Sequence, residues 1–431
     1  MHNWAGNVAF AAARAHRPRT VEETRHLVAA SDRLKVLGSG HSFNRIADTS
    51  GELVVLDELP RSVEVAADLS TVTVTGSMRY SELARELQAW GLALANLASL
   101  PHISVAGSCA TGTHGSGDGL RGLASAVTAL QLITSDGELL DLGRADGDPD
   151  PDPDPDPDDG DRFAGAVVGL GALGVVVGIT LAVEPTFQVA QWVYDAVPLD
   201  RVADRFDEVF GAAYSVSAFT DWGGDTATVW VKRRTDREGP DHLGSRWLDG
   251  RLADGPRHPV PGVPPQHCTR QLGVPGPWHE RLPHFRPDFT PSAGEELQSE
   301  ILLPREAAAE AVAAMRALGP RIAPLLLTSE IRTVAADDLW LSPANGRNSV
   351  AVHCTWRPAG EAVSQAIALV EAELLPLGGR PHWGKLFALH PEAVGALYER
   401  RDDFHRLMRS LDPRSAFRND FIAAVFPEAE A

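Results

Sequence analysis

Glycine-rich stretches constrain this chain more than any other feature of its sequence. In the first stretch, the apolar residues of 34–37 lead directly into Gly38-Ser39-Gly40-His41-Ser42. Glycine adopts a positive φ at little cost and lets a backbone approach a ligand closely. Successive N–H groups in such a turn form a concavity that suits phosphate or another anion. On these residues alone, an ordinary turn at the end of a strand is an equal alternative, because a short glycine-rich loop is a weak signal.

Two further glycine clusters have opposite interpretations. The segment 106–117 mixes glycines with small and hydroxyl residues, and it is longer than a surface loop requires, so we predict that it wraps closely around a large ligand. The segment 169–174 matches the dinucleotide pattern G-x-G-x-x-G. It runs into the strand-like residues 175–181, whereas the dinucleotide turn must open a helix. We therefore exclude a nicotinamide site at 169–174.

Length and composition narrow the class of protein. A chain of 431 residues with 44% apolar residues predicts a globular protein of two domains. The net charge of −19, without a Lys/Arg-rich patch, argues against nucleic acid as a partner. The sequence shows neither a secretory signal nor an apolar run that could span a bilayer. The scattered Cys109, Cys268 and Cys354 argue against a disulfide framework or a metal site, and we expect a cytoplasmic protein.

The first half of the chain predicts a mixed α+β domain rather than a regular βαβ repeat. Thr20 begins a capping box that predicts a helix to about Ser31. Ser81 is expected to cap a second helix, over 82–90, that Gly91 ends. Alternating and β-branched runs predict strands at 34–37, 53–56, 63–65 and 71–75, and a hairpin of 127–134 with 138–142 around Asp136-Gly137.

The second half predicts another α+β block. A Pro-Asp alternation at 148–159 is expected to form an extended, solvated loop, because proline removes donors and the aspartates repel one another. Pro185 marks a plausible boundary, and the tail after about 380 is expected to return to the first domain. Between them, patterns predict helices near 199–213, 305–318 and 361–374, strands at 227–232, 298–303, 325–333 and 349–356, and coil over about 255–291.

Two of these strands present paired polar side chains. Because side chains at i and i+2 share a face, Glu330 and Arg332 point one way, and so do His353 and Thr355 on the other strand. Two such faces predict a polar-lined pocket. For either strand alone, a solvated sheet surface is the simpler alternative.

The chemistry of these residues suits removal of a hydride from a carbinol. Such a reaction needs cations for the developing alkoxide, an acceptor for the hydroxyl proton and an electron sink. Arg332 and Lys385 supply the cations, while Glu330 and His353 supply the acceptor. No amino-acid side chain supplies the sink, so the chain requires a redox cofactor.

Several motifs, in the same order and over nearly the whole chain, resemble the vanillyl-alcohol-oxidase-type flavoproteins. Within that family the bacterial alditol oxidases are the most similar, and the stretches 274–285 and 332–337 also read as that subgroup. The motifs are Gly38-Ser39-Gly40-His41-Ser42, the block 99–108, Ala110-Thr111-Gly112-Thr113-His114-Gly115, Glu330-Ile331-Arg332 and His382-Trp383-Gly384-Lys385.

The resemblance implies a two-domain α+β flavoprotein. It implies an FAD-binding domain over 1–187 that includes the loop 148–159, a substrate or cap domain over 188–379, and a C-terminal segment 380–431 that returns to the FAD domain. His41 would carry FAD covalently through the flavin 8α carbon. The other implied FAD contacts are Val36, Leu37, Gly38, Ser39, Gly40, Ser42, Ser99, Ser104, Gly107, Ser108, Cys109, Ala110, Thr111, Gly112, His114, Val176 and Lys385.

The resemblance also implies the reaction. A hydride would pass from C1 of an alditol such as xylitol or sorbitol to flavin N5, which gives an aldose, and O2 would reoxidise the flavin and yield H2O2. The implied catalytic residues are Glu330, Arg332, His353 and Lys385, and the implied substrate-binding residues are Ser99, Gln298, Glu330, Arg332, Thr355 and Lys385. A monomer is expected, with the polyol and O2 as its partners.

Two alternatives remain open from the sequence. An aldonolactone oxidase or dehydrogenase of the same fold would share the histidine loop and the motif at 382–385, whereas 274–285 and 332–337 favour a polyol enzyme. A flavin-holding or sugar-binding module without turnover is the second alternative. The joint presence of Glu330, Arg332, His353 and Lys385 argues against it, because binding alone requires no cation beside the flavin.

Overall fold

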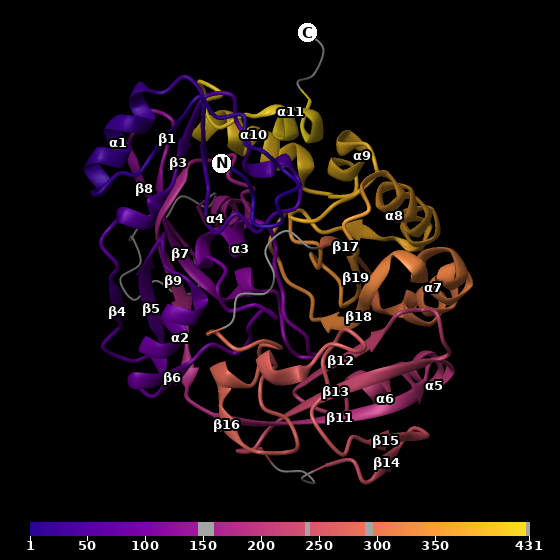
Figure 1. The fold of residues 1–431 in the computed structure, drawn as a ribbon. Helices are drawn as coiled ribbons and strands as arrows, with labels where there is room; N and C mark the ends of the chain where they lie inside the picture. Colours follow the sequence, from indigo (N-terminus) through magenta and orange to yellow (C-terminus); the bar gives the residue numbers. More distant parts are fainter. Residues whose placement is uncertain (145–158, 238–241, 289–295, 428–431) are drawn as a thin grey trace.

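The structure, a computed structural model, describes residues 1–144, 159–237, 242–288 and 296–427 (Figure 1). The predicted Pro-Asp loop at 148–159 lies outside these residues, apart from Asp159, at which helix α4 begins. The three cysteines are free and buried. Among the helices of the described residues, none is long and apolar enough to cross a membrane.

The first part of the chain contains a small parallel sheet and a five-stranded antiparallel sheet. The parallel sheet has the strand order β1-β3-β2, and the antiparallel sheet has the order β4-β5-β9-β7-β8. The strands are β1 (Arg14–His16), β2 (Leu34–Val36), β3 (Glu52–Val54), β4 (Val63–Val65), β5 (Thr71–Thr75), β6 (Leu92–Ala93), β7 (Val127–Ile133), β8 (Leu139–Gly143), β9 (Val175–Ala182) and β10 (Glu184–Pro185), with helices α1 (Val21–Ala30), α2 (Tyr80–Ala89), α3 (Val105–Ala110) and α4 (Asp159–Val167).

The second part contains a ten-stranded sheet with the order β14-β15-β11-β13-β12-β18-β19-β17-β20, and β16 pairs with β11. Helices α5 to α8 lie against this sheet (Figure 1). Their apolar side chains share one buried cluster with side chains of the sheet. The elements are β11 (Gln188–Pro198), α5 (Leu199–Asp204), α6 (Phe206–Phe210), β12 (Ser215–Thr220), β13 (Thr226–Arg234), β14 (Arg246–Trp247), β15 (Gly250–Leu252), β16 (Gly276–Pro277), β17 (Leu297–Pro304), α7 (Ala308–Ile322), β18 (Leu326–Val334), β19 (Ser349–Trp356) and α8 (Gly360–Leu374).

The C-terminal segment lies beside the N-terminal part of the chain (Figure 1). It contains β20 (Arg380–Pro381), α9 (Pro391–Gly395), α10 (Arg401–Leu411) and α11 (Asp420–Val425). The N–H of Leu34 donates to the carbonyl of Ala416 at 2.7 Å, and the Arg414 guanidinium donates to the carbonyl of Ser31 at 2.7 Å. The side chain of Phe417 is buried in the same apolar cluster as Val28.

Most of the predicted elements are present, and their ends follow local chemistry. The Thr20 hydroxyl accepts a bond from the N–H of Glu23, as a capping residue should. The second helix begins earlier than predicted, with Arg79 as its N-cap, so Ser81 lies within its first turn. The predicted helix near 199–213 is two short helices, because Arg205 leaves the helical conformation. Strands β1, β11 and β12 were not predicted.

Candidate active site

One cavity of about 1050 Å³ joins the two glycine-rich loops to the polar face of the ten-stranded sheet. Such a volume lies at the upper end of the range for small-ligand pockets, which is about 300–1,000 Å³. Its wall includes nearly every predicted site residue: Val36, Leu37, Gly38, Ser39, Gly40, His41, Ser42, Ser99, Ser104, Gly107, Ser108, Ala110, Thr111, His114, Val176, Gln298, Glu330, Arg332, His353, Thr355 and Lys385. The side chain of Cys109 instead packs in the core beside Tyr80, and Gly112 abuts Pro343.

The His41 loop is held in place from the N-terminal segment. Gly40 has a φ of +68°, a conformation that glycine adopts easily. Its carbonyl accepts a bond from the N–H of Trp4 at 2.8 Å, and the Asn3 side chain donates to the carbonyl of Ser42 at 2.9 Å. Both ring nitrogens of His41 are buried and have no hydrogen-bond partner among the residues that the structure describes. Burial lowers the pKa of His41 well below its usual value, so the ring is neutral.

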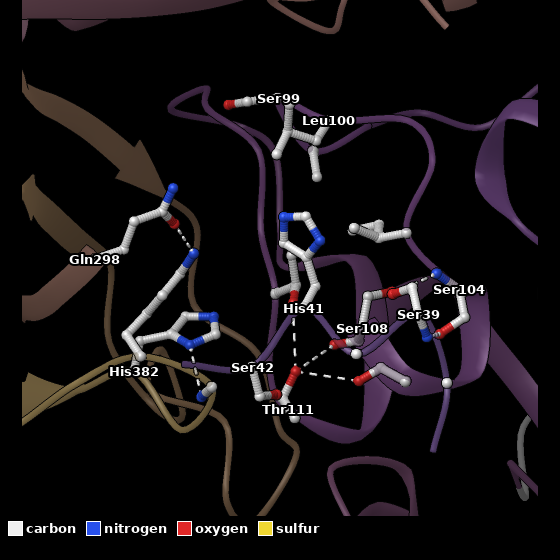
Figure 2. Close-up of a pocket in the computed structure, with 18 of the residues that line it drawn as sticks. Ser39, His41, Ser42, Ser99, Leu100, Ser104, Ser108, Thr111, Gln298 and His382 are labelled. Atoms are coloured by element: carbon white, nitrogen blue, oxygen red, sulfur yellow. Dashed lines mark hydrogen bonds between the residues drawn. The ribbon is translucent and has the colours of Figure 1, made fainter. Parts of the chain in front are cut away.

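A close approach between the two glycine-rich loops shapes the adjoining wall. The N–H of Ser39 donates to the Ser104 hydroxyl, and the N–H of Ser104 donates to the Ser39 hydroxyl, both at 3.3 Å. A Cβ at Gly38 would lie 2.4 Å from the Ser104 Oγ, and one at Gly107 would lie 2.6 Å from the same atom. Only glycine fits at either position without a shift. In the view of Figure 2, the His41 ring lies between Gln298 on one side and Ser104 on the other.

Lys385 reaches the cavity on a loop that is bonded to the His41 loop. The N–H of Phe43 donates to the carbonyl of Gly384 at 2.8 Å. The Asn44 side chain donates to the carbonyls of Trp383 and Lys385, each at 2.8 Å. The Lys385 ammonium donates to the Gln298 side-chain oxygen. Burial lowers the pKa of Lys385 to about 8, so it remains a cation at neutral pH.

The polar face of the sheet forms a row across three strands. His353 on β19 is paired with Glu330 on β18 and with Glu300 on β17. The intervening Ile331 and Val352 pack in the apolar core on the opposite face. The predicted division of the strand faces is therefore confirmed. The polar side chains are buried rather than solvated, since Glu330 is 5% exposed and His353 is 8% exposed.

Buried ion pairs surround Arg332. Its guanidinium donates to Glu300, and its Nε lies 3.6 Å from the Glu330 carboxylate. Burial alone would raise the pKa of each carboxyl, but Arg332 and neighbouring histidines hold both pKa values well below the usual range. Burial lowers the pKa of Arg332, and the two carboxylates more than reverse that effect. The site therefore holds two carboxylates beside a permanent cation.

His353 is a neutral imidazole within this cluster. Its Nε2 lies 3.2 Å from the Thr355 hydroxyl, and its Nδ1 lies 3.6 Å from Glu300. Burial lowers the pKa of His353 below its usual value. A neutral ring with a carboxylate behind one nitrogen has the arrangement of a general base.

Sequence reasoning missed two functional candidates, Glu300 and His284. Glu300 shares a strand face with Gln298, so the same i, i+2 rule that selected Glu330 and Arg332 would have found it. His284 lies in irregular chain, and its Nε2 is 2.8 Å from Glu330. No periodicity marks a loop residue of this kind, and only the tertiary fold brings it to the sheet.

The residues of the cavity fit an FAD group. The glycine-lined approach of the two loops, the unpartnered nitrogens of His41 and the cation at Lys385 provide a cradle, a nucleophile and a charge for a large anionic ligand. The cavity then continues to the polar face of the sheet, where a small polar substrate has room.

Comparison with known proteins supports this assignment. An alditol oxidase from Streptomyces sp. is 49% identical over 424 residues, which is 97% of this chain and 97% of that protein. The chain belongs to the alditol oxidase family. The profile of the FAD binding domain matches residues 12–143, and that of the D-arabinono-1,4-lactone oxidase family matches residues 295–425. The resemblance found in the sequence and the two-domain α+β flavoprotein fold are thus confirmed.

More distant relatives share the whole length of the chain. An L-gulono-1,4-lactone dehydrogenase from Mycobacterium tuberculosis is 28% identical, with 98% of each chain covered. A cholesterol oxidase from B. sterolicum superposes with a TM-score of 0.76 over 99% of this chain and 96% of that chain. At 14% sequence identity, that likeness shows a shared fold and nothing of the substrate.

Proposed function

We propose that the protein is an FAD-dependent oxidase that converts the terminal C1 hydroxyl of alditols such as xylitol and sorbitol to an aldehyde, with O2 reduced to H2O2. One observation carries the proposal. The charged row of Glu330, Arg332 and His353 and the cation Lys385 share one cavity with the His41 loop. The identity of 49% to an alditol oxidase supports the same substrate class.

The glycine-rich loops would hold the cofactor. Residues 36–42 and 104–111 would surround its phosphates, Val176 would lie beside the adenine end, and His41 would form the covalent link. The unpartnered nitrogens of His41 support that link, because a neutral imidazole nitrogen is a competent nucleophile. When bound, FAD supplies the electron sink that accepts a hydride and passes electrons to O2.

The side chains of the sheet would bind and activate the polyol. Arg332 and Lys385 would stabilise negative charge at the reacting oxygen, and preorganised donors of this kind are each worth about 3–4 kcal/mol. His353 would take the hydroxyl proton at Nε2, and the Glu300 carboxylate near Nδ1 would stabilise the charged ring. Glu330 would remain ionised and accept hydrogen bonds from substrate hydroxyls. Gln298, Thr355 and Ser99 would bind the remaining hydroxyls.

A visible spectrum tests the proposal directly. The purified protein should be yellow, the colour should stay in the pellet after acid precipitation, and anaerobic sorbitol should bleach the native protein. Colour in the acid supernatant would refute the covalent link and leave the oxidase intact. A colourless protein that takes up no added FAD would refute the whole proposal.

A lactone substrate is the second candidate. The family profile over 295–425 and the M. tuberculosis relative both carry the name of a lactone enzyme. Sorbitol and gulonolactone should therefore be compared as reductants under anaerobic conditions. Faster bleaching by gulonolactone would show that the substrate is a lactone rather than an alditol. The proposed cofactor and the fold would be unaffected. A monomeric state and a cytoplasmic location stay predictions, which size-exclusion chromatography and cell fractionation test.

A further inference from the structure

We infer that Lys232 and His284 are positioning residues that act through Glu330, so that Lys232, His284 and Glu330 form one buried relay. This inference rests on the proposed function, in which Glu330 binds the substrate as a carboxylate. His284 contacts both other members, with its Nδ1 3.1 Å from the Lys232 Nζ and its Nε2 2.8 Å from the Glu330 Oε1. Neither Lys232 nor His284 belongs to the polar row that the strand pattern predicts.

The environment of Lys232 fits an ammonium group. Its Nζ is surrounded by the carbonyl of Leu282, the carbonyl of Pro283 at 3.3 Å and the Nδ1 of His284. An ammonium group has three hydrogens and no acceptor, so each of these contacts receives one donor. Lys232 is only 1% exposed, and an unpaired cation so deeply buried would be very unfavourable. Burial lowers the pKa of Lys232 to about 7, and the negative charge of Glu330, on the far side of His284, opposes that fall, so the ammonium form prevails below pH 7.

The ammonium fixes the tautomer of His284. Because Lys232 donates to Nδ1, Nδ1 carries no proton and Nε2 carries the proton of the neutral ring. Nε2 then donates to the Glu330 carboxylate, whereas the opposite tautomer would place a lone pair against it. Burial and the Lys232 charge lower the pKa of His284 to about 4, which keeps the ring neutral. Each group in the relay therefore selects the protonation state of the next.

The surrounding residues hold the His284 ring in one orientation. Phe219 and Trp230 both contact it edge-on, with ring centroids 5.3 Å away. The N–H of His284 donates to the carbonyl of Ser99 at 3.1 Å, which ties this loop to a predicted substrate contact. A side chain that only filled space would not need a lysine and a carboxylate on its two nitrogens. The relay therefore adds to the effect of Arg332 on the charge of Glu330 and fixes the direction of its carboxylate.

The relay predicts an effect on substrate binding. The charged or titratable groups that influence Glu330 are Arg332 on its own strand, His353 on β19, His284 in the loop and Lys232 behind it, with Glu300 and Lys385 farther across the cavity. Loss of the His284 N–H donor removes one of the interactions that hold the Glu330 carboxylate in place. Arg332 still keeps the pKa of Glu330 well below neutral pH, so the carboxylate stays ionised and the loss shows as weaker binding of substrate hydroxyls. KM for sorbitol should therefore rise about 10-fold, with a smaller change in kcat.

Three variants of the full-length holoenzyme test the relay. Lys232→Met removes the ammonium, and His284→Met removes the donor to Glu330. Thr269→Val is the matched control, because the Thr269 hydroxyl donates to the same Pro283 carbonyl at 2.8 Å without contacting the ring of His284. His284→Gln is the conservative variant, since its amide N–H remains able to donate to Glu330.

Two readouts separate the relay from the proposed function. The first is KM and kcat for sorbitol, determined separately at pH 6, where Lys232 is mostly an ammonium. We expect Lys232→Met and His284→Met to raise KM more than they lower kcat, His284→Gln to restore most of KM, and Thr269→Val to match the wild type. The second is a 15N spectrum of histidine-labelled protein, in which His284, assigned from its loss in His284→Gln, should show a protonated Nε2.

The outcomes are distinct. A wild type that does not oxidise sorbitol refutes the proposed function, and the 15N spectrum still decides the tautomer. An active wild type with equal KM values in Lys232→Met, His284→Met and Thr269→Val refutes the relay. A protonated Nδ1 in wild-type His284 also refutes it. If Lys232→Met does not fold, His284→Met against His284→Gln makes the same test.

Discussion

Replacement of Glu300 by glutamine should show that this buried carboxylate holds the active-site cations in place. Glu300 accepts from the Arg332 guanidinium, and it also lies 3.3 Å from the Nε2 of His114. Glutamine keeps the size and the hydrogen-bond acceptor but removes the charge. Arg332 then keeps Glu330 as its only carboxylate partner among the ion pairs of the described residues.

The structure sets the magnitude of this effect. Removal of one partner from a buried ion pair costs about 3–5 kcal/mol, and the retained amide oxygen places Glu300→Gln at the lower end, about 3 kcal/mol. A misdirected Arg332 should lower kcat about 100-fold, as the loss of one preorganised donor does. Burial lowers the pKa of Lys385 to about 8, and the charge of Glu300 opposes that fall. Without Glu300 that pKa falls, so the basic limb of kcat/KM moves to lower pH.

Denaturant unfolding and oxygen-electrode kinetics measure these effects. The control is Glu184→Gln, which removes a carboxylate 2.9 Å from another well-buried arginine, Arg234, outside the cavity. Arg234 retains Asp236 as a partner, so this variant should lose less stability and keep the wild-type pH profile. The reasoning fails if Glu300→Gln matches Glu184→Gln in unfolding free energy and leaves the basic limb unchanged.

Three further substitutions test the cofactor cradle and the cation. His41→Ala should leave the yellow colour in the acid supernatant; colour that stays in the pellet would place the covalent link elsewhere. Lys385→Met should lower kcat about 100-fold and abolish the decline in activity above pH 8 that deprotonation of Lys385 should cause, and a rate profile unchanged in shape would contradict that role. Gly38→Ala would place a Cβ 2.4 Å from the Ser104 Oγ and should lower both flavin content and melting temperature. The double variant Gly38→Ala/Ser104→Ala should recover part of both, and no recovery would show that the strain lies elsewhere.

Sequence patterns predicted the features of the fold that depend on neighbouring residues in the chain, such as helix caps and strand faces. Thr20 caps its helix through its own side chain, and the alternation around Ile331 placed Glu330 and Arg332 on one face because β geometry leaves no other choice. The predicted helix near 199–213 is present as two short helices, because Arg205 leaves the helical conformation at a position that composition does not mark. The strand β12 was missed although all six of its residues are buried, since only Val216, Phe219 and Thr220 in it are of the β-branched and aromatic types that mark strands.

The residues of the candidate site also fall into two groups, those that local sequence patterns predicted and those that they missed. Residues of the glycine-rich loops and of β18 and β19 were predicted because they belong to compact motifs with a distinctive composition. Glu300 was missed although its strand was predicted, because a single carboxylate on an alternating strand is ordinary until the facing strand is known. Lys232 and His284 are 52 positions apart in sequence, and each looks unremarkable alone. Their proposed role can be inferred only from the folded structure, which brings the two side chains into contact.

A single loop explains how the two parts of the site keep their spacing. On one side, the N–H of His382 donates to the carbonyl of Glu300 at 3.0 Å and the N–H of Leu386 donates to the carbonyl of Gln298 at 2.9 Å, so residues 382–386 follow strand β17. On the other side, the same loop accepts bonds from Phe43 and Asn44, which follow His41 directly. Backbone groups thus fix the position of the Lys385 cation relative to both the cofactor loop and the charged row. A shift of about 1 Å at a reacting centre has large kinetic effects. The backbone bonds of this loop therefore matter for activity as well as the Lys385 side chain.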